Sequence, residues 1–310
     1  MGLDQIHLNF NPSSLLALNA IIGLMMFGMA LDIRVADFVR ILKTPKGPAI
    51  GLLAQFIFLP ALTFVLTLVI RPAPSIALGM IMVAACPGGN LSNIMTWLAG
   101  GSAALSVSMT AVSTMAAIVM TPLNLALWGS LNPDTAPILR QISLEPLGVL
   151  GTIVTILGIP MTLGMLVAHY MPALAGRVRG PFKLGSVVVF GAFIAIALYA
   201  NWRIFVDVIG LVMLVVLAHN ALALFTGYAS ARLARLDAGD VRAVTIEVGI
   251  QNSALALILI FDFFGGLGGM AIIAAWWGVW HIIAGLALSF FWSRRPIGPA
   301  MDVQQTGDSV

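Results

Sequence analysis

Apolar and polar positions alternate along this chain in long blocks, and each apolar block is about as long as a helix that crosses a bilayer. A hydrocarbon core of roughly 30 Å is crossed by about 20 helical residues. The blocks are Leu15–Leu31, Ile50–Ile70, Ile76–Ala99, Ala103–Trp128, Leu147–Tyr170, Leu184–Ala200, Ile204–Ala231, Val241–Phe263 and Met270–Trp292. The pattern predicts an all-α polytopic membrane protein with about nine transmembrane helices.

The composition agrees with a lipid environment. Of the 310 residues, 60% are apolar and 9% are charged, whereas soluble domains have about 25% charged residues. Cys86 is the single cysteine, which excludes a disulfide framework and a multi-cysteine metal site within one subunit. The formal net charge of +3 is small and does not favour a nucleic-acid partner.

Basic residues predict the orientation of the chain, because Lys and Arg gather in cytoplasmic loops. With the spans above, twelve lie on one side and three on the other. The larger group is Arg34, Arg40, Lys43, Lys46, Arg177, Arg179, Lys183, Arg232, Arg235, Arg242, Arg294 and Arg295, and the smaller is Arg71, Arg140 and Arg203. The carboxyl terminus is therefore expected in the cytoplasm and the amino terminus outside.

Two of the predicted spans contain residues that interrupt a helix, one at Cys86–Asn93 and one at Glu247–Ser253. The first holds a proline and two glycines, which remove a backbone donor and the steric preference for helix. Unpaired backbone groups are tolerated at membrane depth only inside protein or beside a wet cavity. A broken helix is expected at each place. A packing kink in the first and an interhelical hydrogen-bond cluster in the second are the alternatives.

Glu247 is the only acidic residue near the middle of a predicted span. An ionised carboxylate at that depth costs a few kcal/mol on insertion scales. No Lys or Arg lies at midspan, so the simplest partner is a bound cation or a proton. A protonated glutamate hydrogen-bonded to a neighbour is the alternative.

Oxygen-bearing side chains lie where they could join Glu247. Ser92 and Asn93 follow the first break, and Ser106 and Thr110 share one face of the fourth span. Such oxygens favour a hard cation such as sodium over a transition metal. Hydrogen bonds to their own helix are the alternative for Ser106 and Thr110.

The two interrupted spans occupy corresponding positions when the chain is divided after Trp128. Gln55 before the first break then matches His219 before the second. The division predicts an extracellular segment at 1–14, a first repeat of four helices at 15–128 broken at 87–93, a linker at 129–146, a second repeat of five helices at 147–292 broken at 247–253, and a cytoplasmic tail at 293–310. The broken helices enter from opposite sides, so the repeats are inverted, which is typical of secondary transporters. Half-helix amino ends at the crossing favour an anionic solute.

Several motifs resemble the bile acid:sodium symporter family over almost the whole chain. They are Phe27-Gly28-Met29, Cys86-Pro87-Gly88-Gly89 with Ser92-Asn93, Ala104-Leu105-Ser106-Val107, Glu247-Val248-Gly249 with Gln251-Asn252-Ser253, and Trp280-His281. The resemblance implies core and panel domains with two crossing discontinuous helices. It also implies sodium-driven uptake of an organic anion and, for a bacterial-type member, a place in the inner membrane. Bacterial members resemble ten-helix proteins, and the first of those helices is expected to be missing here.

The resemblance further implies two sodium ions and a substrate site. The first sodium site would use Ser92, Asn93, Ser106, Thr110 and Glu247, and the second would use Gln55, Glu247, Gln251 and the carbonyls of Val248 and Ile250. Substrate would lie by Gly89, Asn90, Asn252 and His281. Asn90 and Ile282 depart from many bacterial members, so the ion sites transfer better than the identity of the substrate.

These observations favour a sodium-coupled symporter that takes up an organic anion, such as a bile acid or small carboxylate, by alternating access. A proton-coupled or uncoupled exporter of an anion or metalloid with the same fold is the rival within transport. A membrane receptor that binds an anion without moving it is the rival outside transport. An enzyme is not expected, because no nucleophile and base pair is recognisable. The expected partners are the anion and the lipid bilayer, and the anion and the oligomeric state are left open.

Overall fold

The computed structural model describes residues 42–141, 154–200 and 202–295, together with residues 20, 21, 23, 24, 26–28, 30, 31, 39, 151 and 297. The segment expected at 1–14 lies outside the described residues. Much of the first predicted span, at Leu15–Leu31, and most of the tail at 293–310 also lie outside them.

The described part of the chain is helical apart from its turns and a few isolated β-bridge residues, which confirms the all-α prediction. The helices are α3 (Lys46–Leu53), η2 (Ala54–Phe58), α4 (Leu59–Ile70), α5 (Pro74–Ala85), α6 (Leu91–Leu98), α7 (Ala103–Leu131), α8 (Ala136–Gln141), η3 (Val154–Gly158), α10 (Ile159–Tyr170), α11 (Pro172–Ala200), α12 (Trp202–Leu233), α13 (Ala238–Gly249), α14 (Ser253–Phe264) and α15 (Gly268–Ser293). Among the described residues, four helical stretches are long and apolar enough to cross a membrane: Lys46–Ile70, Ala103–Leu131, Val212–Leu233 and Gly268–Ser293.

Two turns of π-helix, η2 and η3, each precede a proline at the start of the next α-helix. Pro60 has no backbone N–H to bond the carbonyl of Phe56, four residues earlier, and that carbonyl instead accepts from Asn124 Nδ2 at 3.1 Å. Pro160 stands in the same place after η3. Such π-turns are frequent at functional sites, and η2 carries Gln55.

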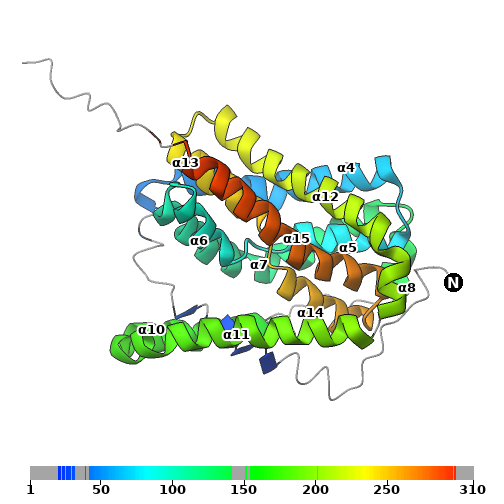
Figure 1. Ribbon diagram of the computed structural model, residues 1–310, viewed down its shortest axis with the longest axis horizontal. Helices are drawn as coiled ribbons and strands as arrows, with labels where there is room; N and C mark the ends of the chain where they lie inside the picture. Colours follow the sequence, from blue (N-terminus) through cyan, green and yellow to red (C-terminus); the bar gives the residue numbers. More distant parts are fainter. Residues whose placement is uncertain are drawn as a thin grey trace, which may run out of the picture.

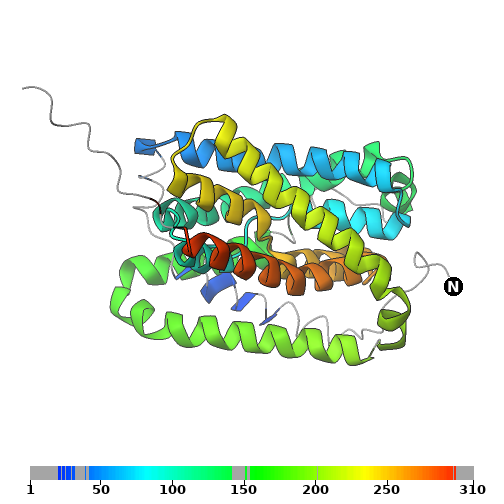
Figure 2. The ribbon, with the colours of Figure 1, turned by 45° about the horizontal axis from the view of Figure 1, so that its top comes forward.

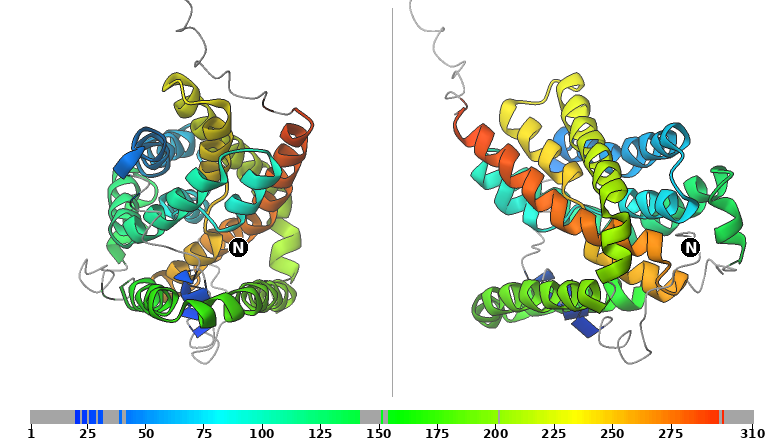
Figure 3. Two further views of the ribbon diagram at one scale, coloured as in Figure 1. Left: turned by 90° about the vertical axis from the view of Figure 1, so that its left-hand side faces the viewer. Right: turned by 45° about the vertical axis from the view of Figure 1, so that its right-hand side comes forward.

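The helices form a main bundle and a separate layer. Helices α10 and α11 are joined through Met171 alone and run side by side along one side of the molecule. The two further views in Figure 3 show the same pair apart from the other helices. Helix α5 lies inside the main bundle, where it packs against α4, α7, α14 and α15.

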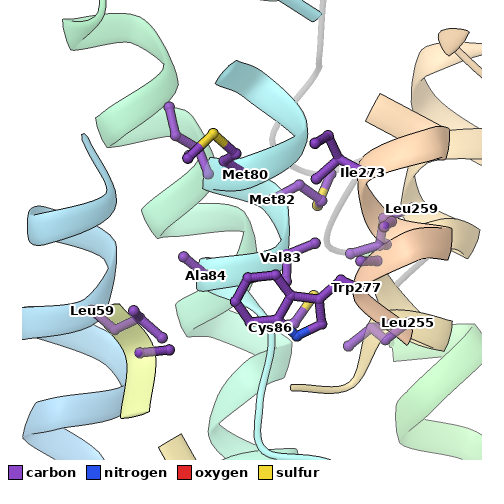
Figure 4. Packing of buried hydrophobic residues seen from close by; sticks show 14 of the residues in the cluster. Leu59, Met80, Met82, Val83, Ala84, Cys86, Leu255, Leu259, Ile273 and Trp277 are labelled. Atoms are coloured by element: carbon purple, nitrogen blue, oxygen red, sulfur yellow. The ribbon is translucent and has the colours of Figure 1, made fainter. Parts of the chain in front are cut away.

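The two short apolar helices at the centre of the bundle are enclosed by protein. Eleven of the 12 residues of α5 and ten of the 12 of α14 are buried. A helix of this length spans about 18 Å, less than the bilayer core, so each ends inside the protein. Figure 4 shows Trp277 of α15 lying among Val83, Cys86 and Leu255 at this centre.

Helix α11 is longer than the sixth span predicted from sequence. The expected span begins at Leu184, but α11 begins at Pro172 and includes the basic segment that was expected to be a loop. The charges in this segment lower its hydropathy, yet Ala, Leu, Arg and Lys are good helix formers. The linker expected at 129–146 likewise contains the end of α7 and the short helix α8.

Gly79 allows α5 to lie against α15, because a Cβ at this position would be 2.8 Å from Met270 Cα. We expect Gly79→Ala to destabilise the protein by about 1–3 kcal/mol through overpacking, although alanine is the better helix former. Thermal unfolding in detergent measures the change. The control is Gly176→Ala in α11, where a Cβ meets nothing within 4 Å. Equal melting temperatures for the two variants would contradict the close packing.

Candidate functional site

The two predicted breaks cross each other and pair through their backbones. Gly88 and Gln251 form an antiparallel bridge. Gly89 N donates to Ile250 O at 2.7 Å, and Asn252 N donates to Pro87 O at 2.9 Å. Helices α6 and α13 extend to one side of this crossing, and α5 and α14 extend to the other (Figure 1). Each break therefore supplies the hydrogen-bond partners that the other lacks at membrane depth.

Three polar side chains from neighbouring helices bond carbonyls where α5 and α13 end. Thr121 Oγ1 donates to Ala85 O, Gln55 Nε2 donates to Cys86 O, and Asn220 Nδ2 donates to Gly249 O, each at 2.8 Å. The last carbonyls of a helix have no partner within it. These side chains therefore stabilise the chain where each helix stops.

The sequence suggested that His219 matches Gln55, but in the structure the matching residue is Asn220. Gln55 and Asn220 each bond the carbonyl at the end of the broken helix that follows them. His219 points elsewhere, with Nε2 2.8 Å from Thr63 Oγ1 and its ring edge-on to Trp277. Local sequence similarity was one residue out of register, which on a helix changes the face by about 100°.

Glu247 is fully buried and surrounded by hydroxyl groups. Ser92 Oγ lies 2.5 Å and Ser106 Oγ 3.0 Å from Glu247 Oε2, and Thr110 Oγ1 lies 2.6 Å from Oε1. The three hydroxyls come from α6 and α7, and Glu247 comes from α13. The site thus brings together residues up to 155 positions apart in the chain.

Asn93 completes this group of oxygens, which we call the Glu247 cluster: Ser92, Asn93, Ser106, Thr110 and Glu247. Asn93 Oδ1 is 2.8 Å from Ser106 Oγ and 3.2 Å from Thr110 Oγ1. The cluster has five short side-chain oxygen contacts, but its three hydroxyls carry only one proton each. With an ionised glutamate and with Oδ1 of Asn93 turned toward the two hydroxyls, two of the contacts have no proton between their oxygens.

Gly88 brings the first break against the Glu247 cluster. A Cβ at Gly88 would overlap Glu247 Oε1, so a side chain of any size would push the carboxylate away. The sequence marked this glycine only as a helix breaker. Its second role follows from the approach of two segments that are distant in sequence.

The residues expected for a second ion site also meet. Gln55 Nε2 donates to Gln251 Oε1 at 2.8 Å, and Gln251 Nε2 donates to Val248 O at 2.6 Å. Ile250 O accepts the Gly89 N–H of the crossing. The amide orientations follow from these hydrogen bonds. Val248 O therefore becomes available to a cation when Gln251 turns its amide nitrogen away.

The residues expected to bind substrate lie around the crossing. Gly89 is part of the backbone pairing, and Asn90 precedes the first turn of α6 without capping that helix through its side chain. Asn252 Oδ1 caps α14 by accepting from Leu255 N at 3.1 Å, which leaves its amide nitrogen to donate elsewhere. Helices α6 and α14 thus both begin at the breaks, and the partial positive charges of their amino ends favour an anion there.

His281 lies on the face of α15 that is turned to the second break. A Cβ at Gly278 would be 2.8 Å from Ser253 Oγ, and one at Gly285 would be 2.7 Å from Ile250 Cδ1. His281 is three residues after the first glycine and four before the second, so all three share one face. Its Nδ1 has no hydrogen-bond partner within the described structure.

Comparison with known proteins identifies the family. A model of the sodium bile acid symporter family matches residues 20–208. Over 88% of its length the chain is 31% identical to the sodium-dependent transporter YocS of Bacillus subtilis, of which it covers 82%. The chain belongs to the sodium bile acid symporter family.

Two further relatives are named for the ions and solutes that they carry. The chain is 33% identical to the chloroplast sodium/metabolite cotransporter BASS1 of Arabidopsis thaliana, over 87% of this chain and 65% of that protein. It is 31% identical to the human ileal sodium/bile acid cotransporter, over 78% of this chain and 68% of that protein. The family consists of sodium-dependent transporters rather than enzymes, and the chain is a membrane transporter with sodium as the associated ion.

Removal of one hydroxyl from the Glu247 cluster tests this geometry. Ser106→Ala deletes contacts to Glu247 and Asn93, whereas Ser108→Ala, the matched control, deletes only a bond to Ala104 O of the same helix. We expect Ser106→Ala to cost about 1.5–3 kcal/mol, the range for hydrogen bonds to charged groups, and Ser108→Ala to be nearly neutral. Thermal unfolding of both variants gives the difference, and equal effects would contradict the assigned contacts.

Proposed function

We propose that this protein is a sodium-coupled symporter that takes up a small organic anion by alternating access. The observation that carries the proposal is the shortage of protons in the Glu247 cluster. Oxygens held in contact without protons between them repel one another, and the burial of Glu247 leaves no water to relieve this. A cation at the centre of the cluster resolves both problems, because it neutralises the carboxylate and attracts every oxygen.

Sodium fits the chemistry of the cluster. Its oxygens come from one carboxylate, one amide and three hydroxyls, and hard cations prefer such ligands. On binding, each hydroxyl turns its lone pairs to the ion and its proton outward. The side chains that contact one another by hydrogen bonds without the ion would then each contact the ion. Helices α6, α7 and α13 would therefore be held together more tightly in the sodium-bound state.

A second sodium ion is supported by the Gln55 and Gln251 pair. Their amide oxygens and the carbonyls of Val248 and Ile250 form a further group of neutral oxygens beside the crossing. The Gly88–Gln251 bridge places this group next to the Gly88 contact with Glu247. Because the two cations would share the negative charge of Glu247, the occupancy of each site would affect the affinity of the other.

The anion is proposed to bind at the crossing once the ions are in place. The amino ends of α6 and α14 begin there, and the side chains of Asn90, Asn252 and His281 can donate hydrogen bonds. With the carboxylate neutralised by cations, an anion no longer meets uncompensated negative charge. This order of binding makes uptake depend on sodium.

Alternating access requires two parts that move against each other. The layer of α10 and α11 and the main bundle are the two parts that we assign to panel and core. The equivalent bonds of Gln55 and Asn220 to the ends of α5 and α13 support the assignment of inverted repeats. Inverted repeats of this kind allow one structure to open to either side of the membrane.

A proton-coupled transporter is the second candidate, and the same cluster favours it. Protonation of Glu247 would also supply a missing proton between two oxygens of the cluster. Replacement of sodium by choline at constant pH separates the two couplings. Uptake that continues in choline and follows the pH gradient would favour the proton.

Glu247→Gln tests the sodium-coupled function. The substitution keeps the size of the side chain but removes the negative charge that attracts a cation, so sodium-driven uptake of labelled carboxylates into proteoliposomes should fall to the background of empty liposomes. Asp134→Asn, which removes an exposed carboxylate from the turn after α7, should transport normally. Sodium-dependent uptake by Glu247→Gln at the unmodified rate would contradict the role of the carboxylate.

Gln251→Ala tests the second ion. We expect the Hill coefficient for sodium to fall from about two to about one, because the first site is left intact. Gln141→Ala at the exposed end of α8 is the control. Sodium dependence of initial uptake rates measures both. An unchanged Hill coefficient would show that Gln251 holds no cation.

A further inference from the structure

Arg242 is a buried cation that none of the proposed binding sites uses. It lies on α13, five residues before Glu247, and is only 9% exposed. Its guanidinium donates to main-chain carbonyls: Nη1 to Ala99 O at 2.5 Å and to Trp292 O at 3.3 Å, and Nη2 to Arg295 O at 2.5 Å. The guanidinium also lies over the ring of Trp292, with Arg242 Cζ 5.8 Å from the ring centroid.

These acceptors are the carboxyl ends of two helices. Ala99 is the C-cap residue that directly follows α6, and Trp292 lies in the last turn of α15. The last carbonyls of a helix have no partner farther along it and together carry about half a negative charge. Trp292 O also accepts from Arg295 N at 2.9 Å, so Ala99 O depends more on the guanidinium. Two such ends meeting at one point would repel each other, and the guanidinium of Arg242 lies between them and offsets this repulsion. Arg294 and Arg295 follow the end of α15, but their guanidinium groups lie over the rings of Phe290 and Phe291.

The chain around Arg242 is shaped to admit it. Gly100, which follows α6, has a left-handed backbone with φ of +64°. A Cβ at Gly101 would lie 3.0 Å from Arg242 Cβ. Glycines at both positions let the end of α6 turn closely over α13, so that the guanidinium reaches the carbonyl of Ala99.

We propose that Arg242 is a positioning residue for the sodium site around Glu247, an inference that rests on the proposed function. Helix α6 has eight residues and carries Ser92 and Asn93 in its first turn. A helix that short is not stable alone. Glu247 holds it at the break and Arg242 holds it at the other end, and both residues belong to α13.

The two attachments define how α6 sits along α13. Without the one at Ala99, the carboxyl end of α6 is held less firmly against α13, and any shift of the helix moves Ser92 and Asn93 together because they share one turn. Ser289 Oγ, which donates to Met95 O at 2.9 Å, ties the same helix to α15. Arg242 joins all three helices, and a planar guanidinium with five donors suits divergent carbonyls better than an ammonium group does.

Arg242→Lys tests the proposal, because it keeps the charge and loses the fork of donors. Loss of a group that orients metal ligands weakens metal affinity by about 10–100-fold. We expect a shift of that size in the sodium concentration that gives half-maximal uptake, while the maximal rate at saturating sodium stays within about twofold of the unmodified protein. Sodium-dependent thermal stabilisation in detergent gives the same affinity without transport.

Gly101→Ala supplies a second route to the same result. Its Cβ would lie 3.0 Å from both Arg242 Cβ and Thr96 Cγ2, so it pushes α6 and α13 apart at this end without altering the guanidinium. It should therefore weaken sodium affinity in the same direction. The controls are Arg232→Lys, at an exposed position on α12, and Gly239→Ala, where a Cβ would have only ordinary contacts of 3.5 Å or more. If Arg242→Lys does not fold, Gly101→Ala carries the comparison.

The outcomes distinguish this proposal from the function on which it rests. An unmodified protein that shows no response to sodium would overturn both. An unmodified protein that responds to sodium, with Arg242→Lys or Gly101→Ala matching its half-saturating concentration, would overturn the positioning role alone. A drop in melting temperature without any change in sodium affinity would likewise assign Arg242 to stability only.

Discussion

The structure depends on the backbone pairing between two interrupted helices. Proline and glycine make the chain leave the helix at the centre of the bundle, where unpaired amide groups are most costly. The breaks at Gly88 and Gln251 solve this by bonding to each other. That pairing fixes the relation between α6 and α13, and with it the distance from Ser92 to Glu247. The oxygens of the Glu247 cluster thus come together because the two interrupted backbones pair with each other.

The same pairing also explains why the carboxylate of Glu247 lies among hydroxyl groups. A carboxylate buried among hydroxyls gains hydrogen bonds, but the cluster has more oxygen contacts than protons. Such a site is incomplete without a further positive charge, whether a cation or a proton. In the proposed function, a bound sodium ion would complete the cluster and change the contacts between helices that also border the crossing. Arg242 is proposed to act in a complementary way at the carboxyl ends of α6 and α15, where its permanent positive charge offsets the negative helix ends.

Much of the site was predictable from the sequence because its chemistry is unusual for a membrane span. Glu247, Ser92 and Asn93 stand out as polar residues beside helix breakers, and the structure brings them together. Asn220 and Thr121 were missed, since single polar residues in apolar helices usually bond within their own helix. The contact between Gly88 and Glu247, and the convergence of carbonyls on Arg242, depend on tertiary approach that no local pattern encodes. The length of α11 was missed because hydropathy, rather than helix propensity, set its predicted start.

The most direct test is a pair of high-resolution structures of the protein, one in sodium and one in choline. The account predicts a density peak among the oxygens of Ser92, Asn93, Ser106, Thr110 and Glu247 in sodium alone. It also predicts that the hydroxyls of Ser92, Ser106 and Thr110 turn away from the carboxylate toward that peak. Identical side-chain arrangements in both structures, with no peak at Glu247, would contradict it.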